Sequence, residues 1–221
     1  MQKFSHPYAH LKQPFFDHLY AINPTLTRKQ RWWLWQDIAR RYSESGRTYH
    51  TLAHIDQLLS QFARIHPHLN APHLIALALF YHDVVYDPKR GDNEQKSADY
   101  AASLLHPHIG TQQSKRLYAL IMMTAGHELQ DKQDTDAAYL LDMDLSILGA
   151  DWSAYARYAQ AVRQEYAHVS DGDYQRGRVG VLTQLLAHPR LYLTPDFAPL
   201  EPQARRNIQR EMEHLSAHIP C

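Results

Sequence analysis

Apolar residues recur at three- and four-residue spacing through most of this chain, and strand-like alternation of apolar and polar residues is nearly absent. That spacing is the repeat of a helix with one buried face, so it predicts an all-α protein built as a helical bundle. We expect helices at 9–21, 27–44, 50–66, 71–86, 93–106, 111–126, 135–148, 151–170, 173–188 and 201–217.

Several of these expected helices begin after a residue that can cap them. Asn70 precedes Ala71-Pro72, Asp92 precedes Asn93, and Asp151 precedes Trp152. Side chains of these types accept hydrogen bonds from the free N–H groups of a first helical turn. Prolines such as Pro67 and Pro189 indicate that a helix closes before them.

The chain shows no break that would separate two domains. It has eight glycines, no internal repeat, and no Gly/Ser-rich or charged linker in its 221 residues. A chain of this length suits one well-packed core. We therefore expect a single helical domain over residues 1–221.

The balance of charge limits the kinds of partner. Acidic and basic residues number 23 each, so the chain lacks the basic excess that general binding to nucleic acid or to an anionic membrane requires. A small molecule is the expected partner, and a homo-oligomer stays open.

The most apolar stretch, Leu74–Phe80, is too short to span a bilayer. The N-terminus has no apolar leader pattern and Cys221 is the only cysteine, which predicts a cytoplasmic protein.

The segment Leu74–Tyr81 is apolar on every side, which predicts a helix buried in the middle of the bundle. It runs directly into His82 and Asp83. An imidazole and a carboxylate are costly to bury unless partners neutralise them. A metal cation would do so, and the alternative is a helix end that emerges into water.

Three further patches carry side chains of the kind that bind metals. His50 and His54 are one helical turn apart and share a face. His127 follows an apolar run, where a histidine that merely ends a helix is the alternative. Asp142 and Asp144 are set into another apolar run, and the alternative is one capping and one solvated carboxylate. Bundle cores build metal sites from separate helices in this way.

The order His54, then His82-Asp83, then Asp144 resembles the H…HD…D signature of the HD superfamily of metal-dependent phosphohydrolases. The likeness covers about residues 28–215. Within the superfamily, the sequence is similar to a bacterial subgroup labelled predicted HD phosphohydrolases. It is carried by the runs YHTLAH (49–54), FYHDVVYD (80–87), NEQKSA (93–98), DMDLSILG (142–149), RQEY (163–166), Gly177-Arg178 and the segment 201–215 with ARRN.

The resemblance implies a single HD-type helical domain and a divalent metal. Its ligands would be His54, His82, Asp83 and Asp144. Asp142 competes with Asp144 for the last place. His127 lies about where a ligand of a second metal could come from, but the sequence lacks a second histidine beside it. Mixed histidine and carboxylate ligands suit Mn, Mg, Fe, Ni, Co or Zn and do not choose among them.

The implied chemistry is hydrolysis of a phosphoester by metal-activated water. Asp83 would bind the metal and orient the water, while Glu94 or Asp87 would relay a proton.

The substrate phosphate would be held by Arg47, Tyr49 and His50, with Arg47 able to form a bidentate fork. For Arg47 and Tyr49 the alternative is that they only staple the loop before the third helix.

Two classes of function follow from these expectations. The first is a hydrolase that acts on a nucleotide or other small phosphoester, which the full ligand set and Glu94 favour. The second is a non-catalytic regulatory module that binds a metal and a nucleotide. An HD-type di-iron oxygenase is a third alternative, which the weak evidence for a second metal site disfavours.

Overall fold

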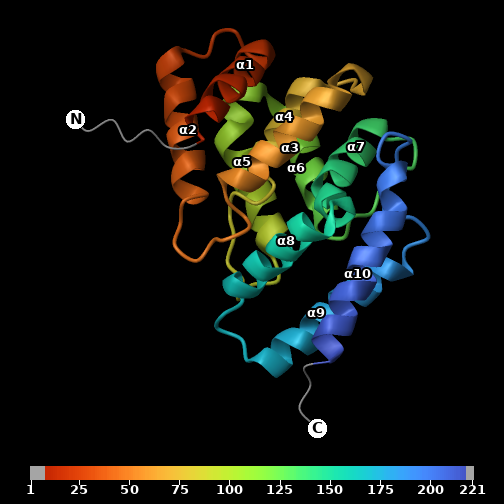
Figure 1. Cartoon of the computed structure of the whole chain (residues 1–221). Helices are drawn as coiled ribbons and strands as arrows, with labels where there is room; N and C mark the ends of the chain where they lie inside the picture. The colour runs from red at the N-terminus through yellow and green to blue at the C-terminus, as the bar shows by residue number, and fades with distance from the viewer. Residues whose placement is uncertain (1–7, 218–221) are drawn as a thin grey trace. The chain divides into compact units, whose positions relative to one another are not determined.

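The computed structural model describes residues 8–217, and every regular element in this range is helical (Figure 1). The prediction of an all-α protein is therefore confirmed. The α-helices are α1 (Lys12–Ile22), α2 (Arg28–Arg41), α3 (Leu52–Ile65), α4 (Pro72–Tyr81), α5 (Asn93–Ile109), α6 (Thr111–Thr124), α7 (Thr135–Asp144), α8 (Trp152–Glu165), α9 (Asp171–Ala187) and α10 (Glu201–Ser216). Short 3-10 helices are η1 (Ala9–Leu11), η2 (His66–His68), η3 (Leu145–Gly149) and η4 (Ala198–Leu200).

The chain forms two compact units that meet in sequence inside α7. The first unit is Met1–Leu140 and the second is Leu141–Cys221. A single domain over the whole chain stays a prediction. Cys221 and residues 1–7, which are part of what the expected compartment rested on, lie outside the described residues. Within 8–217, no helix is both long and apolar enough to cross a membrane.

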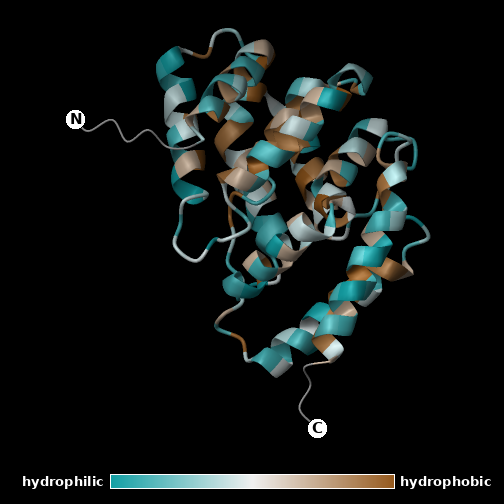
Figure 2. Ribbon diagram, in the orientation of Figure 1, coloured by the Kyte–Doolittle hydropathy of each residue, from teal (hydrophilic) through white to brown (hydrophobic). Residues whose placement is uncertain are grey.

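Helix α4 is the central helix of the first unit. It packs against α1, α3, α5 and α6, and all of its residues from Leu74 to Tyr81 are buried. Its flanks are closed by aromatic rings, for example Phe15 of α1 against Phe80 at a centroid distance of 5.0 Å. The prediction of a helix buried on all sides is confirmed. Figure 2 shows the contrast with α2, which is mostly hydrophilic or intermediate along its length.

The start of α4 is held by another helix. The carboxylate of Asp136, in the first turn of α7, accepts the backbone N–H groups of Asn70 and Ala71, each at 2.8 Å. The cap expected from Asn70 is therefore wrong: Ala71 is the capping position, with Pro72 next. Tertiary packing supplies a carboxylate where the local sequence offers only an amide.

The other two expected caps have opposite outcomes. Asp151 caps α8 as predicted, because its side chain accepts the N–H of Ala154 at 2.9 Å. Asp92 is at the capping position of α5 but forms no capping bond. Its carboxylate instead pairs with Arg90 at 2.7 Å.

The ends of α4, α5 and α8 differ from those expected. Helix α4 ends at Tyr81, five residues before the expected end at 86, because the carbonyls of Asp83 and Val84 bond to Arg47 instead of continuing the helix. Helix α5 continues through Pro107 to Ile109. Helix α8 ends at Glu165 rather than 170, and the side chain of Arg163 binds the carbonyls that follow it.

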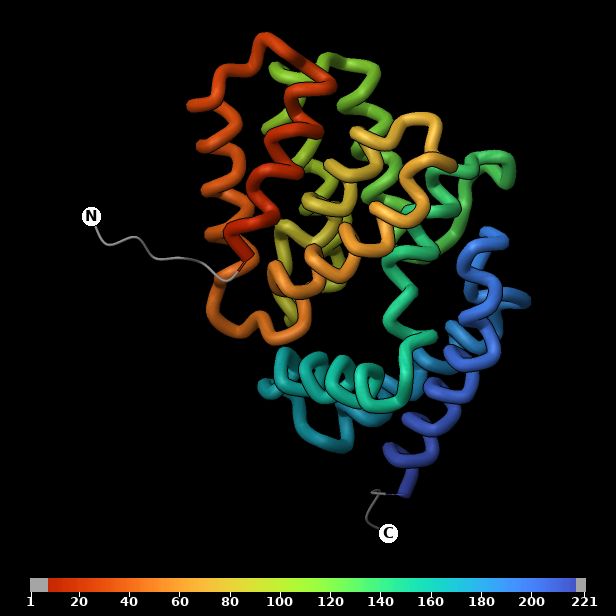
Figure 3. Tube along the Cα trace, turned by 45° about the horizontal axis from the view of Figure 1, so that its top comes forward, coloured from red at the N-terminus to blue at the C-terminus, as the bar shows by residue number. Residues whose placement is uncertain are grey.

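In the second unit, α10 packs against α8, α9 and η3, and Figure 3 traces this part of the chain from α8 to α10. Glu211 of α10 accepts two hydrogen bonds from Arg178 of α9, at 2.8 and 3.1 Å. Tyr155 of α8 donates a third bond to the same carboxylate. One carboxylate thus joins all three helices.

Leu77 is fully buried in α4, so Leu77→Ala should lower the free energy of unfolding by roughly 2–5 kcal/mol. Val181→Ala, at a position 49% exposed, should lower it by less than about 0.5 kcal/mol. Urea unfolding of both variants measures the difference. Equal losses would mean that α4 does not form the core.

Candidate metal centre

Three of the predicted ligands converge in the first unit. His54 is on α3, and His82 and Asp83 directly follow α4; all three are buried. The Nε2 atoms of His54 and His82 are 3.2 Å apart. Oδ2 of Asp83 lies 2.9 Å from Nε2 of His82 and 3.9 Å from Nε2 of His54. Segments 28 residues apart in sequence therefore bring two ring nitrogens and a carboxylate to one point.

The orientation of the His82 ring is set by the helix that precedes it. Its Nδ1 lies 2.9 Å from the carbonyl oxygen of Leu79. A carbonyl can only accept a hydrogen bond, so Nδ1 carries the proton. In the neutral ring, Nε2 then carries the lone pair and faces His54 and Asp83. Metal-binding histidines are commonly held in this way, with the second ring nitrogen donating to a carbonyl or carboxylate.

Asp144 completes a group that could hold a metal ion. It is the last residue of α7, one helical turn beyond Leu140. His54, His82 and Asp144 each offer a ligand atom, and these atoms all lie within 4.8 Å of one another. The described residues thus contain a histidine and aspartate group with the composition of a metal site.

Asp142 has a different set of partners. It is fully buried, and its carboxylate accepts the backbone N–H groups of Leu193 and Thr194, each at 2.7 Å, and the Thr194 hydroxyl at 2.6 Å. Burial raises the pKa of this carboxyl to about 6, although the three donors oppose the shift. Asp142 therefore anchors the segment after α9, and of the two competing aspartates only Asp144 belongs to the group that could hold a metal ion.

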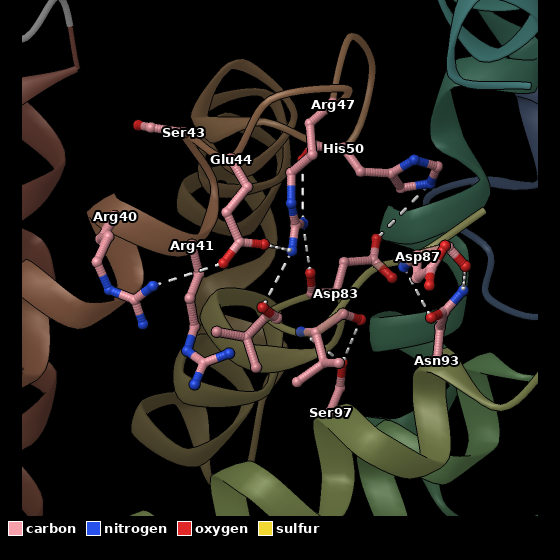
Figure 4. A network of polar contacts seen from close by, with 12 residues as sticks. Arg40, Arg41, Ser43, Glu44, Arg47, His50, Asp83, Asp87, Asn93 and Ser97 are labelled. Carbon is pink, nitrogen blue, oxygen red and sulfur yellow. Dashed lines mark hydrogen bonds and ion pairs between the residues drawn. The ribbon is translucent and has the colours of Figure 1, made fainter. Parts of the chain in front are cut away.

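Arg47 fastens the loop before α3 to the turn that carries the ligands. Its guanidinium donates to the carbonyls of Asp83 at 2.7 Å, Val84 at 3.1 Å and His50 at 3.2 Å (Figure 4). These contacts match the stapling alternative, and contact with a substrate phosphate stays a prediction. The sequence pattern gave no sign that the carbonyls after His82 would be the partners.

Two more predicted site residues border the cluster. Nε2 of His50 is 3.9 Å from Oδ2 of Asp83, and its ring stacks on Tyr86 with centroids 4.2 Å apart. The Tyr49 ring lies 4.8 Å from the ring of His54. Both side chains belong to the turn that leads into α3, so they flank the ligands on one side.

The predicted proton relays lie where the loop after Asp83 enters α5. Glu94 is half-buried at the second position of α5 and forms no hydrogen bond or ion pair with another residue of 8–217. Asp87 is partly engaged, because its carboxylate accepts the N–H of Lys89 at 2.9 Å. The roles of Asp87 and Glu94 as proton relays stay predictions.

Two residues that the sequence did not single out hold this loop in place. Asn93 bonds both the N–H and the carbonyl of Asp87, each at 2.9 Å. Ser97 bonds both the N–H and the carbonyl of Val85, each at 3.1 Å (Figure 4). Both lie in the NEQKSA run, where their polar side chains on a buried helix face were the available signal.

His127, the candidate ligand of a second metal, follows α6 in a turn with a positive φ of 50°. It is outside the group formed by His54, His82 and Asp144.

The raised pKa of Asp142 predicts a pH-dependent stability. The folded-state value of about 6 is above the ordinary value of 3.8, so the folded protein holds this proton more tightly than the unfolded chain. The protonated carboxyl of Asp142 therefore contributes to the free energy of unfolding below about pH 4. This contribution, at most about 3 kcal/mol, is lost as the pH rises through about 6. Urea unfolding across this range should show the fall in the wild type and lack it in Asp142→Asn, whereas parallel curves would contradict the assignment.

Comparison of the chain with protein-family models, curated proteins and solved structures gives no match. The likeness to the HD superfamily therefore rests on the motifs of the sequence.

Proposed function

We propose that this chain is a metal-dependent phosphohydrolase of the HD superfamily, acting on a nucleotide or another small phosphoester. The observation that carries the proposal is the convergence of two buried imidazole nitrogens, His54 Nε2 and His82 Nε2, at 3.2 Å beside the Asp83 carboxylate. Buried polar groups at this density need a cation or a shared proton to offset their desolvation.

The distances among these three side chains fit a shared ion. Histidine nitrogens and carboxylate oxygens bind zinc-sized ions at about 2.0–2.2 Å, so two ligand atoms of one ion are at most about 4.4 Å apart. The three separations, 2.9, 3.2 and 3.9 Å, are all below that limit. A single ion can therefore contact all three side chains. Asp144 would be the fourth ligand after a small movement, since its ligand atom lies within 4.8 Å of those of the two histidines.

A bound divalent ion would lower the pKa of a water molecule and polarise a phosphoryl oxygen. The chain's own residues have separate tasks in this proposal. Asp83 orients the attacking water through its second carboxylate oxygen. Arg47 holds the backbone of Asp83, and His50 and Tyr49 border the substrate. As the water oxygen bonds to phosphorus, Glu94, whose half-buried carboxylate has no partner in the described chain, takes the proton that the water loses and passes it to the leaving oxygen as the P–O bond breaks.

The metal site is tested by removing one ligand. His82→Ala should weaken Mn²⁺ binding by at least about 10²-fold, because an incomplete set of ligands binds weakly. His106→Ala, which removes an exposed histidine on α5, is the control and should bind as the wild type does. Isothermal titration with Mn²⁺, Co²⁺, Ni²⁺ and Zn²⁺ measures binding, and circular dichroism checks the fold of each variant. If His82→Ala binds these ions as tightly as the wild type does, the proposed metal site is wrong.

The proton relay is tested by Glu94→Gln, assayed on the phosphoester that the wild type hydrolyses best in a panel of nucleotides and aryl phosphates. The amide cannot exchange a proton, so kcat should fall by about 10²–10⁴-fold while the affinity for Mn²⁺ stays unchanged. Glu213→Gln, at an exposed position of α10, should leave kcat unchanged. An unaltered kcat in Glu94→Gln would leave Glu94 without a catalytic role. A wild type that binds metal but hydrolyses no phosphoester would favour the non-catalytic module.

A further inference from the structure

Exposed aromatic side chains lie on two adjoining helices of the first unit, α1 and α2. Trp32 and Trp33 of α2 are 40% and 59% exposed, and Tyr20 of α1 is 50% exposed. The two indoles contact each other edge to face, with centroids 4.7 Å apart. Val181, in the second unit, is the remaining large hydrophobic residue that is exposed in the described chain. Single exposed apolar residues are ordinary, but a cluster of them marks a binding surface.

Positive charge lies next to these rings. Arg28 and Lys29 are exposed in the first turn of α2, and neither forms an ion pair within residues 8–217. Arg31 lies over the ring of Tyr20 at 5.1 Å. There is no acidic residue between Asp17 and Asp37. The zero net charge of the chain therefore conceals a local excess of cations.

These cations are placed where they do not help the fold. The N-terminus of a helix carries the positive end of its dipole, so basic residues there are unfavourable. The first turn of α2 contains no acidic residue, and its cap is a neutral pair, Thr27 with Gln30. Two unpaired cations at this end, beside exposed indoles, are explained by an anionic partner.

We propose that the α2 surface, formed by Tyr20, Arg28, Lys29, Trp32 and Trp33, binds the face of an anionic lipid bilayer. Indole and phenol rings are favoured at the level of the headgroups, because one end is apolar and the other is polar. Lysine and arginine beside them are attracted to anionic headgroups. The surface is on helices already folded against α4, so it binds peripherally and nothing has to insert across the bilayer.

Two other occupants fit the surface less well. A second copy docked face to face would bring Arg28 and Lys29 near the same cations of its partner, where like charges repel. Single-stranded nucleic acid is bound by stacking bases on open aromatic faces and by tracking several phosphates with cations. Here the two indoles cover part of each other, and only two cations are unpaired.

The experiment is co-sedimentation of the full chain with vesicles. The wild type should bind vesicles of phosphatidylcholine containing phosphatidylglycerol, bind pure phosphatidylcholine weakly, and dissociate at high salt. Two double variants test the surface, Trp32→Ala/Trp33→Ala and Arg28→Gln/Lys29→Gln. Each should bind the anionic vesicles at least roughly tenfold more weakly than the wild type does. Gln112→Glu/Gln113→Glu is the matched control, since it changes the net charge by the same amount at the start of α6 and should retain most of the binding.

Thermal unfolding separates binding from folding. Arg28→Gln/Lys29→Gln should be at least as stable as the wild type, because it removes unfavourable charge from the helix N-terminus. Loss of vesicle binding in a variant of undiminished stability supports the proposal. Equal binding to neutral and anionic vesicles, an equal loss in the α6 control, tighter binding to a single-stranded oligonucleotide, or a dimer that the tryptophan variant abolishes would each overturn it.

Discussion

Helix α4 is buried on every side, so the polar groups that directly follow it have little water to bond with and must find partners in the protein. Arg47 provides partners for the backbone by binding the carbonyls of Asp83 and Val84. Leu79 provides one for the His82 ring. The remaining side-chain atoms, Nε2 of His82 and the Asp83 carboxylate, meet Nε2 of His54 from α3. The end of this one helix therefore determines where the candidate metal site forms.

The two aspartates of α7 show how a helix divides neighbouring side chains between tasks. Residues two apart in an α-helix point to nearly opposite sides, so Asp142 and Asp144 cannot serve the same centre. Asp142 accepts three hydrogen bonds from the segment at 193–194. Asp144 groups with the two histidines. A carboxylate with three fixed donors is a structural anchor, whereas Asp144 is in a group that could hold a metal ion.

The arginines and lysines of the chain fall into distinct physical roles. Arg47 and Arg178 are enclosed and bind carbonyls or a carboxylate, so their charge organises backbone and helices. Arg116 and Arg205 form ion pairs nearer the surface. Arg28 and Lys29 pair with nothing in the described chain and sit at the wrong end of a helix dipole. Because the fold neither uses nor neutralises these two charges, we expect an external anion to bind beside them.

The sequence by itself determined the helical class, the buried α4 and the set of side chains able to bind a metal, because helical period and apolar runs are local properties. It also placed His54, His82 and Asp83 in one site through their motifs. Only the tertiary structure gave Asp142 its three hydrogen-bond donors, bound Arg47 to the carbonyls of Asp83 and Val84, and brought Asp136 to the backbone that leads into α4. Each of those outcomes depends on which donors and acceptors other segments bring within hydrogen-bond distance, and spacing along a single chain does not encode that.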